Sequence, residues 1–202
     1  MTAGLPEPAT WLFDQAGNIY GTTVSGGSFE GVNCASGGCG AVFELTPSNG
    51  GWTESVLYSF TDGSDGSYPW SVVIFDRAGN LYGAASRGGP NYGGTVYQLQ
   101  PSGSGWAFNT IYGLGNDADS PYGDLILDSS GNLYGTSGFG GPNDAGTAFK
   151  LGLSDGVWTY TSLHDFTDNS NGGSDGAEPV TSLVFDANGN LYGNTRQGGS
   201  SG

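Results

Sequence analysis

The chain has 202 residues, and it combines 40 glycines and 13% aromatic residues with only 11% charged residues. Four Lys and Arg residues stand against 19 Asp and Glu residues, so the net charge is −15 at pH 7. Such a surface repels phosphate backbones and anionic lipid heads, which argues against nucleic acid and membrane surfaces as partners. No apolar run approaches the roughly 18 residues of a membrane span. We therefore expect no membrane span, and we expect any signal peptide to lie outside this chain.

One short phrase, Gly-Asn-Leu-Tyr-Gly, recurs along the chain. Three copies are identical and the first has Ile for Leu; they begin at Gly17, Gly79, Gly131 and Gly189. Copies that follow one another at intervals of 52 to 62 residues indicate a repeat architecture. Because the glycines fall at fixed places between apolar runs, they predict turns rather than disorder.

Each unit begins with two predicted strands joined by a tight turn. In the second unit, Pro69 leads into the apolar run 72–75, which predicts a short buried strand, strand A. An Asp-x-x-Gly turn, 76–79, then leads into strand B. The leading Asp of this turn accepts backbone N–H bonds, and its Gly supplies a positive φ. Strand B contains Leu81 and Tyr82, which we expect to point to opposite faces.

Two further strands complete the unit. A glycine-rich loop follows strand B and leads into the alternating segment 94–99, strand C, which predicts a half-exposed strand. A turn, a tryptophan and strand D, ending at 111–114, come next. The tryptophans and strand-B tyrosines recur, so we interpret them as packing residues: Trp52, Trp106, Trp158, Tyr20, Tyr82, Tyr134 and Tyr192.

Four antiparallel strands joined by tight turns form one blade of a β-propeller. The predicted fold is therefore all-β, with about three and a half blades in a single domain, 1–202. The blades span about 8–60, 69–114 and 121–166, and 179–202 supplies only strands A and B.

The phrase Gly-Asn-Leu-Tyr-Gly, the Gly-Gly pairs after it, Gly-Thr-Val-Tyr/Phe-x-Leu and Leu-Tyr-x-Phe resemble the GloVer tandem repeat of the choice-of-anchor family. That resemblance covers nearly the whole chain and implies a propeller, export and often anchoring to the bacterial cell envelope. It implies no known activity and brings no catalytic residues. A looser similarity, carried by Asp-x-x-Gly-Asn-Leu-Tyr, links the chain to NHL and gluconolactonase-type propellers, whose metal-ligand motifs have no counterpart here.

Propellers close with about four to eight blades, so this number of blades leaves the ring open. Three explanations remain: a fragment of a longer repeat protein, an arc that completes a ring or stack by oligomerising, or a filament joined at its open edges. In each case we expect self-association or poor solubility of the isolated monomer.

Cys34 and Cys39 are the only cysteines and share one Gly/Ser-rich loop. We predict a short loop disulfide, which would agree with an exported, extracellular or cell-surface protein. A reduced pair is the alternative, and two cysteines alone cannot form a structural zinc site.

The D-to-A loops and B-to-C loops share one face of a propeller, and here they vary most. The D-to-A loops are acidic and could bind calcium, although Asp and Gly are also ordinary turn residues and no EF-hand pattern is present. The candidate ligands are Asp62, Asp65, Asp117, Asp119, Asp168 and Asp175.

Aromatic residues that occur in one unit only accompany these acids on the predicted loop face. Flat rings beside carboxylates could hold a neutral sugar, or they could pack against the neighbouring loop. The candidates are Tyr68, Trp70, Tyr92, Tyr122 and Phe139.

Catalytic motifs are sparse. His164 is the only histidine and replaces Tyr58 and Tyr112 in strand D, so we interpret it as a strand residue. We therefore expect a non-catalytic propeller that binds a glycan or protein, or its own copies. A polysaccharide hydrolase or lyase using loop carboxylates such as Asp65 and Asp119 is one alternative. A structural subunit of an extracellular filament is another.

Overall fold

The structure is a computed structural model that describes residues 12–28, 34, 37–167 and 175–199. Within these residues the chain forms three four-stranded antiparallel sheets and one two-stranded sheet, each with its strands in chain order. The first sheet contains β1 (Leu12–Phe13), β2 (Ile19–Thr23), β3 (Ala41–Ser48) and β4 (Gly51–Ser59), and the second contains β5 (Ile74–Phe75), β6 (Leu81–Ala85), β7 (Thr95–Ser102) and β8 (Gly105–Gly113). The third sheet contains β9 (Ile126–Leu127), β10 (Leu133–Ser137), β11 (Thr147–Ser154) and β12 (Val157–Asp165). The two-stranded sheet contains β13 (Val184–Phe185) and β14 (Leu191–Tyr192).

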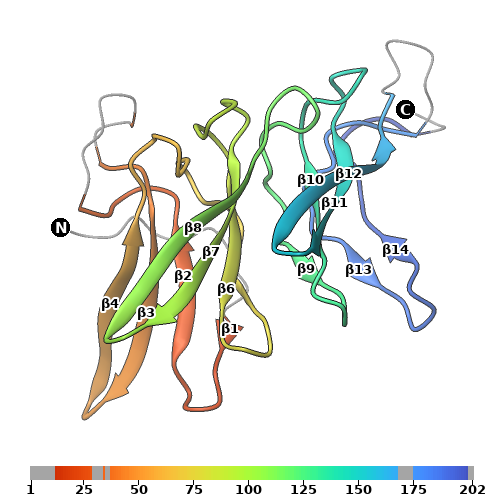
Figure 1. The fold of residues 1–202 in the computed structure, drawn as a ribbon. Coiled ribbons are helices and arrows are strands. Elements are labelled where there is room, and N and C mark those ends of the chain that lie inside the picture. The colour runs from red at the N-terminus through yellow and green to blue at the C-terminus, as the bar shows by residue number, and fades with distance from the viewer. Residues whose placement is uncertain (1–11, 29–33, 35–36, 168–174, 200–202) are drawn as a thin grey trace.

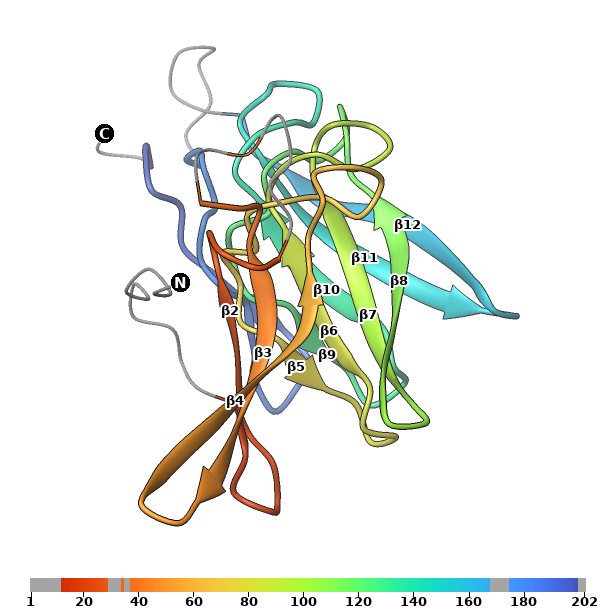
Figure 2. The ribbon, with the colours of Figure 1, turned by 90° about the vertical axis from the view of Figure 1, so that its left-hand side faces the viewer.

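The predicted propeller architecture is confirmed as an open arc of blades. Figures 1 and 2 show the sheets side by side, with β3 and β4 at one end of the arc and β13 and β14 at the other. The hairpins between strands C and D point to one face, and the longer loops gather on the opposite face. Within the described residues no helix is long and apolar enough to cross a membrane.

The blades are held together by two apolar clusters that lie between neighbouring sheets. Leu81 faces back toward the first blade, and Tyr82 faces forward toward the third, as expected for adjacent residues of one strand. Tyr97 and Phe149 occupy the same position of strand C and fill the centres of the two clusters. Packing between blades therefore explains why an aliphatic residue, Leu or Ile, and a Tyr recur in every unit.

The last glycine of the repeated phrase is required by this packing. Gly83 lies directly opposite Tyr97 in the β6–β7 ladder, and a Cβ at Gly83 would clash with the Tyr97 ring. In the third blade Gly135 lies opposite Phe149 in the same way. An aromatic ring thus covers the glycine of the neighbouring strand in both blades.

The Asp-x-x-Gly turn forms as predicted. The Asp76 carboxylate accepts hydrogen bonds from the N–H groups of Ala78 (2.8 Å) and Asn80 (2.9 Å), from Asn80 Nδ2 (2.7 Å) and from the Tyr82 hydroxyl (3.1 Å). Gly79 closes the turn with a φ of 86°. Burial raises the pKa of Asp76, but the hydrogen bonds, chiefly those from Asn80, outweigh burial and hold the pKa below its ordinary value.

Strand A is shorter than predicted. The run 72–75 predicts a four-residue strand, but only Ile74 and Phe75 pair with β6. Before this run, the side chain of Ser71 makes the hydrogen bonds to β6 that a strand backbone would make. Its hydroxyl accepts from Ala84 N (3.0 Å) and donates to Ala84 O (3.2 Å). Val72 and Val73 remain apolar although their backbone does not pair with β6. The apolar pattern of the sequence therefore overestimates the length of strand A.

The interpretation of all recurring aromatic residues as packing residues is wrong at the two ends of the arc. Trp52 is 51% exposed and Tyr192 is 55% exposed, whereas their counterparts Trp106 and Tyr82 lie against a neighbouring blade. The reason is that the described residues place no blade before Trp52 and none after Tyr192.

Candidate functional site

The loop face carries a cleft of about 760 Å³, which we call the Tyr68–Tyr92 cleft. It lies where the loop after the first blade, the B-to-C loop of the second blade and the loop after the second blade meet. Its walls include two aromatic rings, one cation and two carboxylates, contributed by Tyr68, Tyr92, Arg87, Asp62 and Asp119. Four of these five residues are sequence candidates, and Arg87 is the one that sequence reasoning missed.

Backbone hydrogen bonds from two blades hold Tyr68. Its N–H donates to Cys39 O (2.8 Å) in the first blade, and its carbonyl accepts from Ser86 N (3.1 Å) and Ser86 Oγ (2.9 Å) in the second. Its φ of 55° lies in the left-handed region, which is uncommon for a bulky residue. The next two units hold Ser120 and Glu178, also before proline, with the same sign of φ. The unusual backbone is therefore a property of the repeat, and the tyrosine ring is specific to this unit.

Arg87 lies over the Tyr68 ring, with its guanidinium carbon 5.5 Å from the ring centroid, a cation–π arrangement. The backbone brings the two residues together, because Ser67 N donates to Arg87 O (2.8 Å) and Arg87 N donates to Ser67 O (3.1 Å). These hydrogen bonds join residues that are twenty positions apart in the sequence. Only the alignment of one loop with the next strand could have revealed this contact from the sequence.

Tyr92 is the most exposed large apolar side chain among those described, at 86%. It lines the Tyr68–Tyr92 cleft and also a second cleft of about 490 Å³, which includes Tyr112, Asp117 and Tyr160. Its φ is 64°, and Asp144, the counterpart in the third blade, has a φ of 52°. The turn therefore accepts either Tyr or Asp at this position. It fixes where the side chain lies but does not require an aromatic ring there.

Asp62 and Asp119 each accept a short hydrogen bond from a serine hydroxyl. Ser67 Oγ donates to Asp62 Oδ1 (2.5 Å), and Ser120 Oγ donates to Asp119 Oδ1 (2.8 Å). Both carboxylates line the Tyr68–Tyr92 cleft, so the structure brings these two predicted site residues together.

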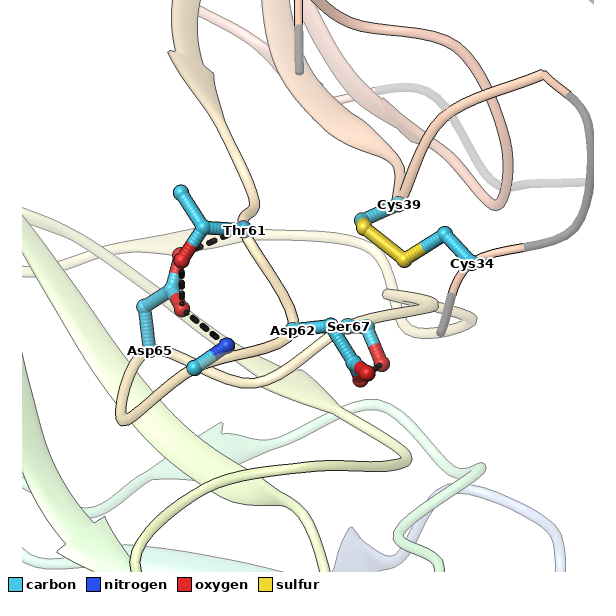
Figure 3. Close-up of a disulfide and its surroundings, with 7 residues drawn as sticks. Cys34, Cys39, Thr61, Asp62, Asp65 and Ser67 are labelled. Carbon is cyan, nitrogen blue, oxygen red and sulfur yellow. Dashed lines mark hydrogen bonds between the residues drawn. A yellow bond between two sulfur atoms is a disulfide. The ribbon is translucent and has the colours of Figure 1, made fainter. Parts of the chain in front are cut away.

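Asp65 has a different role from Asp62, although both occupy one loop (Figure 3). It is only 6% exposed, and its carboxylate accepts hydrogen bonds from the Tyr58 hydroxyl (2.9 Å), Thr61 N (2.7 Å), Thr61 Oγ1 (2.6 Å) and Gly63 N (3.1 Å). Burial and the hydrogen bond to Asp65 raise the pKa of Tyr58, which keeps the donor protonated. Asp65 therefore stabilises the loop, and its engaged oxygens make it a poor general acid or base.

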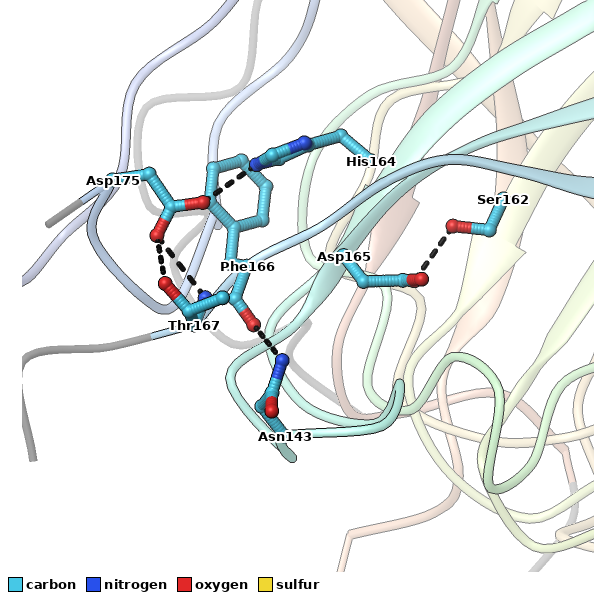
Figure 4. A network of polar contacts seen from close by, with 7 residues as sticks. All are labelled: Asn143, Ser162, His164, Asp165, Phe166, Thr167 and Asp175. Atoms are coloured by element: carbon cyan, nitrogen blue, oxygen red, sulfur yellow. Dashed lines mark hydrogen bonds and ion pairs between the residues drawn. The ribbon is translucent and has the colours of Figure 1, made fainter. Parts of the chain in front are cut away.

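Asp175 plays the same part after the third blade (Figure 4). It accepts from Thr167 Oγ1 (2.5 Å), Thr167 N (3.1 Å) and His164 Nε2 (2.7 Å). The Thr167 hydroxyl and then His164 lower the pKa of Asp175. In the first unit, the Tyr58 hydroxyl donates to the carboxylate of Asp65. His164 stands at the position of Tyr58 and contacts Asp175, the equivalent carboxylate of its own unit, so it replaces the tyrosine in this pair. The sequence carries a signal for this pairing, since Asp65, Asp117 and Asp175 all stand four residues before a proline.

The remaining aromatic candidates lie outside the Tyr68–Tyr92 cleft. Trp70 and Tyr122 contact one another edge to face, with ring centroids 6.3 Å apart, and link the second blade to the third. Phe139 is 39% exposed and occupies the position that Arg87 has in the preceding unit, with a backbone bridge to Asp119. The five candidate rings therefore divide into a pair in the cleft and three residues elsewhere.

The predicted calcium ligands do not converge in the described part of the chain. No group of three or more His, Cys, Asp or Glu side chains there could hold a metal ion. Asp117 lines the second cleft, and Asp168 lies outside the described residues.

Cys34 and Cys39 form a disulfide, with Cα atoms 5.2 Å apart (Figure 3). Cys39 is fully buried in the cluster between the first two blades. Its carbonyl accepts the hydrogen bond from Tyr68 N, so this bridge lies directly behind the backbone that supports the cleft.

Comparison with curated proteins returns no match. The model of the Gloeobacter/Verrucomicrobia repeat matches residues 6–202, which is nearly the whole chain. The match spans all the recurring units, whose repeated phrase packs the blades together. The chain therefore belongs to the Gloeobacter/Verrucomicrobia repeat family.

Proposed function

We propose that the chain is a non-catalytic, exported binding module that holds a glycan in the Tyr68–Tyr92 cleft. The observation that carries the proposal is the composition of this cleft, in which two rings, an arginine and two carboxylates surround a volume of about 760 Å³. Binding sites for small ligands typically measure about 300–1,000 Å³ and combine rings with a few convergent polar groups.

The chemistry of the cleft fits a neutral sugar. A sugar ring has an apolar C–H face that can lie on Tyr92, and its hydroxyls can donate to Asp62 and Asp119 and accept from Arg87. The net charge of −15 disfavours acidic polysaccharides. A neutral glycan therefore uses Tyr92, Arg87 and the two carboxylates of the cleft without bringing like charges together.

The disulfide supports the proposed location. Disulfides persist in oxidising compartments and are rare in the cytosol. The bridge between Cys34 and Cys39 lies next to the cleft, since the Cys39 carbonyl accepts the hydrogen bond from Tyr68 N. An extracellular or cell-surface location is therefore the setting in which this bridge would persist.

A glycan array with the complete chain tests the proposal. We expect binding to neutral glycans, and we expect Tyr92→Asn to weaken it at least tenfold, which is about 1.4 kcal/mol. Asn tolerates the left-handed backbone at this position, so the variant removes the ring and keeps the turn. Trp52→Ala is the matched control, because it removes an exposed aromatic side chain near the tip of the β3–β4 hairpin, on the face opposite the loops.

Two results would contradict the proposal. Binding that survives both Tyr92→Asn and Arg87→Ala would place the ligand elsewhere on the molecule. An array without any hit, together with binding to a protein partner that these two variants abolish, would replace the glycan with a protein ligand at the same cleft.

A further inference from the structure

The second cleft lies beside the Tyr68–Tyr92 cleft and shares a wall with it. Pro90 and Tyr92 line both clefts. The loop after the second blade also reaches both, since its residues 115–118 line the second cleft and its residues 119–120 line the Tyr68–Tyr92 cleft. The two clefts therefore adjoin one another at the turn that carries Tyr92.

This turn is held against the second blade by a hydrogen bond and by close packing. Asn91 Nδ2 donates to Gly113 O (2.8 Å). Gly115 lies so near that a Cβ at this position would be 2.8 Å from the Cβ of Asn91. The exposed ring of Tyr92 is thus carried between the two clefts by a backbone that the blade holds in place.

The aspartate that stands four residues before the proline is engaged by its own loop in the first and third units (Figures 3 and 4). Asp65 accepts from the N–H and the hydroxyl of Thr61. Asp175 accepts from the same two groups of Thr167. In each unit the strand-D residue adds a further hydrogen bond to the same carboxylate. These two carboxylates therefore serve the loop.

The second unit departs from this pattern. Gly115 takes the place of the threonine, so the hydroxyl donor is missing, and Tyr112 stands two residues nearer to its proline than Tyr58 does. Within the part of the chain that the structure describes, neither the Asp117 carboxylate nor the Tyr112 hydroxyl forms a hydrogen bond. Asp117 is exposed, and both residues line the second cleft.

Tyr160 of the third blade completes the second cleft. Its ring stacks on that of Tyr112, with centroids 5.4 Å apart and planes 15° apart, and its hydroxyl donates to Asp117 O (3.0 Å). Burial and then the charge of Asp117 raise the pKa of Tyr112, so its hydroxyl stays protonated at neutral pH and can donate to a ligand. A hydroxyl, a carboxylate and an exposed ring can together bind the hydroxyls and the apolar face of a neutral sugar.

We propose that the two clefts are adjoining subsites for one neutral oligosaccharide, with successive sugar units on either side of the Tyr92 ring. The inference rests on the proposed function and extends it, because it makes the ligand a chain of sugars and assigns Asp117 as the acceptor of the second subsite. The second cleft, at about 490 Å³, is large enough to hold a small ligand by itself. The carboxylate of Asp117 carries the argument, since its counterparts are engaged by their own loops.

Binding of a length series to the complete chain tests the inference. The probes are neutral oligosaccharides of one to six units from the glucan, mannan and xylan series, and calorimetry measures their affinity. Arg87→Ala alters only the Tyr68–Tyr92 cleft, and Asp117→Ala alters only the second cleft, whereas Tyr92 lines both. Glu54→Ala is the matched control, because it removes an exposed carboxylate from β4 near the β3–β4 hairpin.

We expect the affinity of the unmodified chain to rise at least about tenfold along the series, as the probe becomes long enough to enter both clefts. Asp117→Ala should remove most of this rise and leave the affinity for the shortest binding probe unchanged. Arg87→Ala should weaken probes of every length, and Glu54→Ala should match the unmodified chain. Asp117→Ala should not unfold at a lower urea concentration, because its carboxylate forms no hydrogen bond in the described part of the chain.

The contrary results separate this inference from the proposed function. Affinity that Arg87→Ala weakens, but that does not rise with length, would overturn the second subsite and leave the proposed function standing. A rise with length that survives Asp117→Ala would place the additional sugar units outside the second cleft. No binding by any of these neutral probes would contradict the proposed function, and the inference would fall with it.

Discussion

Tyr97 offers a direct test of how the blade core is packed. Its side chain is fully buried, and its hydroxyl is the buried side-chain polar atom for which the described residues provide no hydrogen-bond partner. The corresponding residues of the other two blades are Phe43 and Phe149. A buried hydroxyl without a partner destabilises a protein by about 1–3 kcal/mol, and this burial raises the pKa of Tyr97.

We therefore expect Tyr97→Phe to raise the free energy of unfolding by about 1 kcal/mol, the lower part of that range, because the oxygen fills the space above Gly83 that the substitution would leave empty. For a chain of this length the melting temperature should rise by about 2–4 °C. Urea unfolding with an unchanged slope is the appropriate assay, since the substitution should not alter the surface exposed on unfolding. Phe149→Tyr is the reciprocal control and should lower stability by about 1–3 kcal/mol. A Tyr97→Phe variant that loses 1 kcal/mol or more would show that the hydroxyl is satisfied and that the reasoning is wrong.

Three further predictions follow from the hydrogen bonds of the loops and turns. The folded pKa of Asp76 lies below its ordinary value of 3.8, so the stability that its carboxylate contributes is present above that value and is lost as the pH falls through the folded pKa. The urea concentration at the midpoint of unfolding should therefore decline below about pH 4. This decline should be less steep in Asp76→Asn. Asp65→Ala leaves several donors without an acceptor and should cost about 2–4 kcal/mol, whereas Asp62→Ala in the same loop should cost under about 1 kcal/mol, as thermal unfolding of the pair will show. Reduction of the bridge between Cys34 and Cys39 should lower stability by about 2 kcal/mol in the chain-entropy model, and Cys34→Ser/Cys39→Ser should match the reduced protein.

The regular parts of the blades could be predicted because each unit repeats the same packing. Leu81 and Tyr82 alternate between two interfaces, and a residue that contacts a neighbouring blade must recur wherever a blade follows. The same logic fails where the series stops, since recurrence describes the position and not its surroundings. Trp52 has the sequence context of Trp106, but the described residues place no blade beside it, and it is exposed.

The loops could be predicted only as a group. Asp62 and Asp65 are three residues apart in an acidic loop, and composition treats them alike, yet one lines the cleft and the other is buried among hydrogen-bond donors. The two aspartates differ in their number of positions before Pro69, the residue at which the loop joins the next blade. Only Asp65 stands four residues before this proline, the spacing that recurs for Asp117 and Asp175. The contact of Arg87 with Tyr68 depends on two segments that lie far apart in the sequence, and no local pattern encodes it.

The cleft combines a common frame with single-copy side chains, and this combination favours binding over a purely structural role. Tyr68 N–H and carbonyl form hydrogen bonds to two different blades, so its ring is carried by a backbone that both blades hold in place. Ser120 and Glu178 have the same backbone conformation in the later units without an aromatic ring. If the ring were needed to form the turn, it would recur as the proline after it does. The ring is restricted to the unit that also supplies Arg87 and Tyr92, and this grouping of single-copy side chains is the reason for which we propose a binding role.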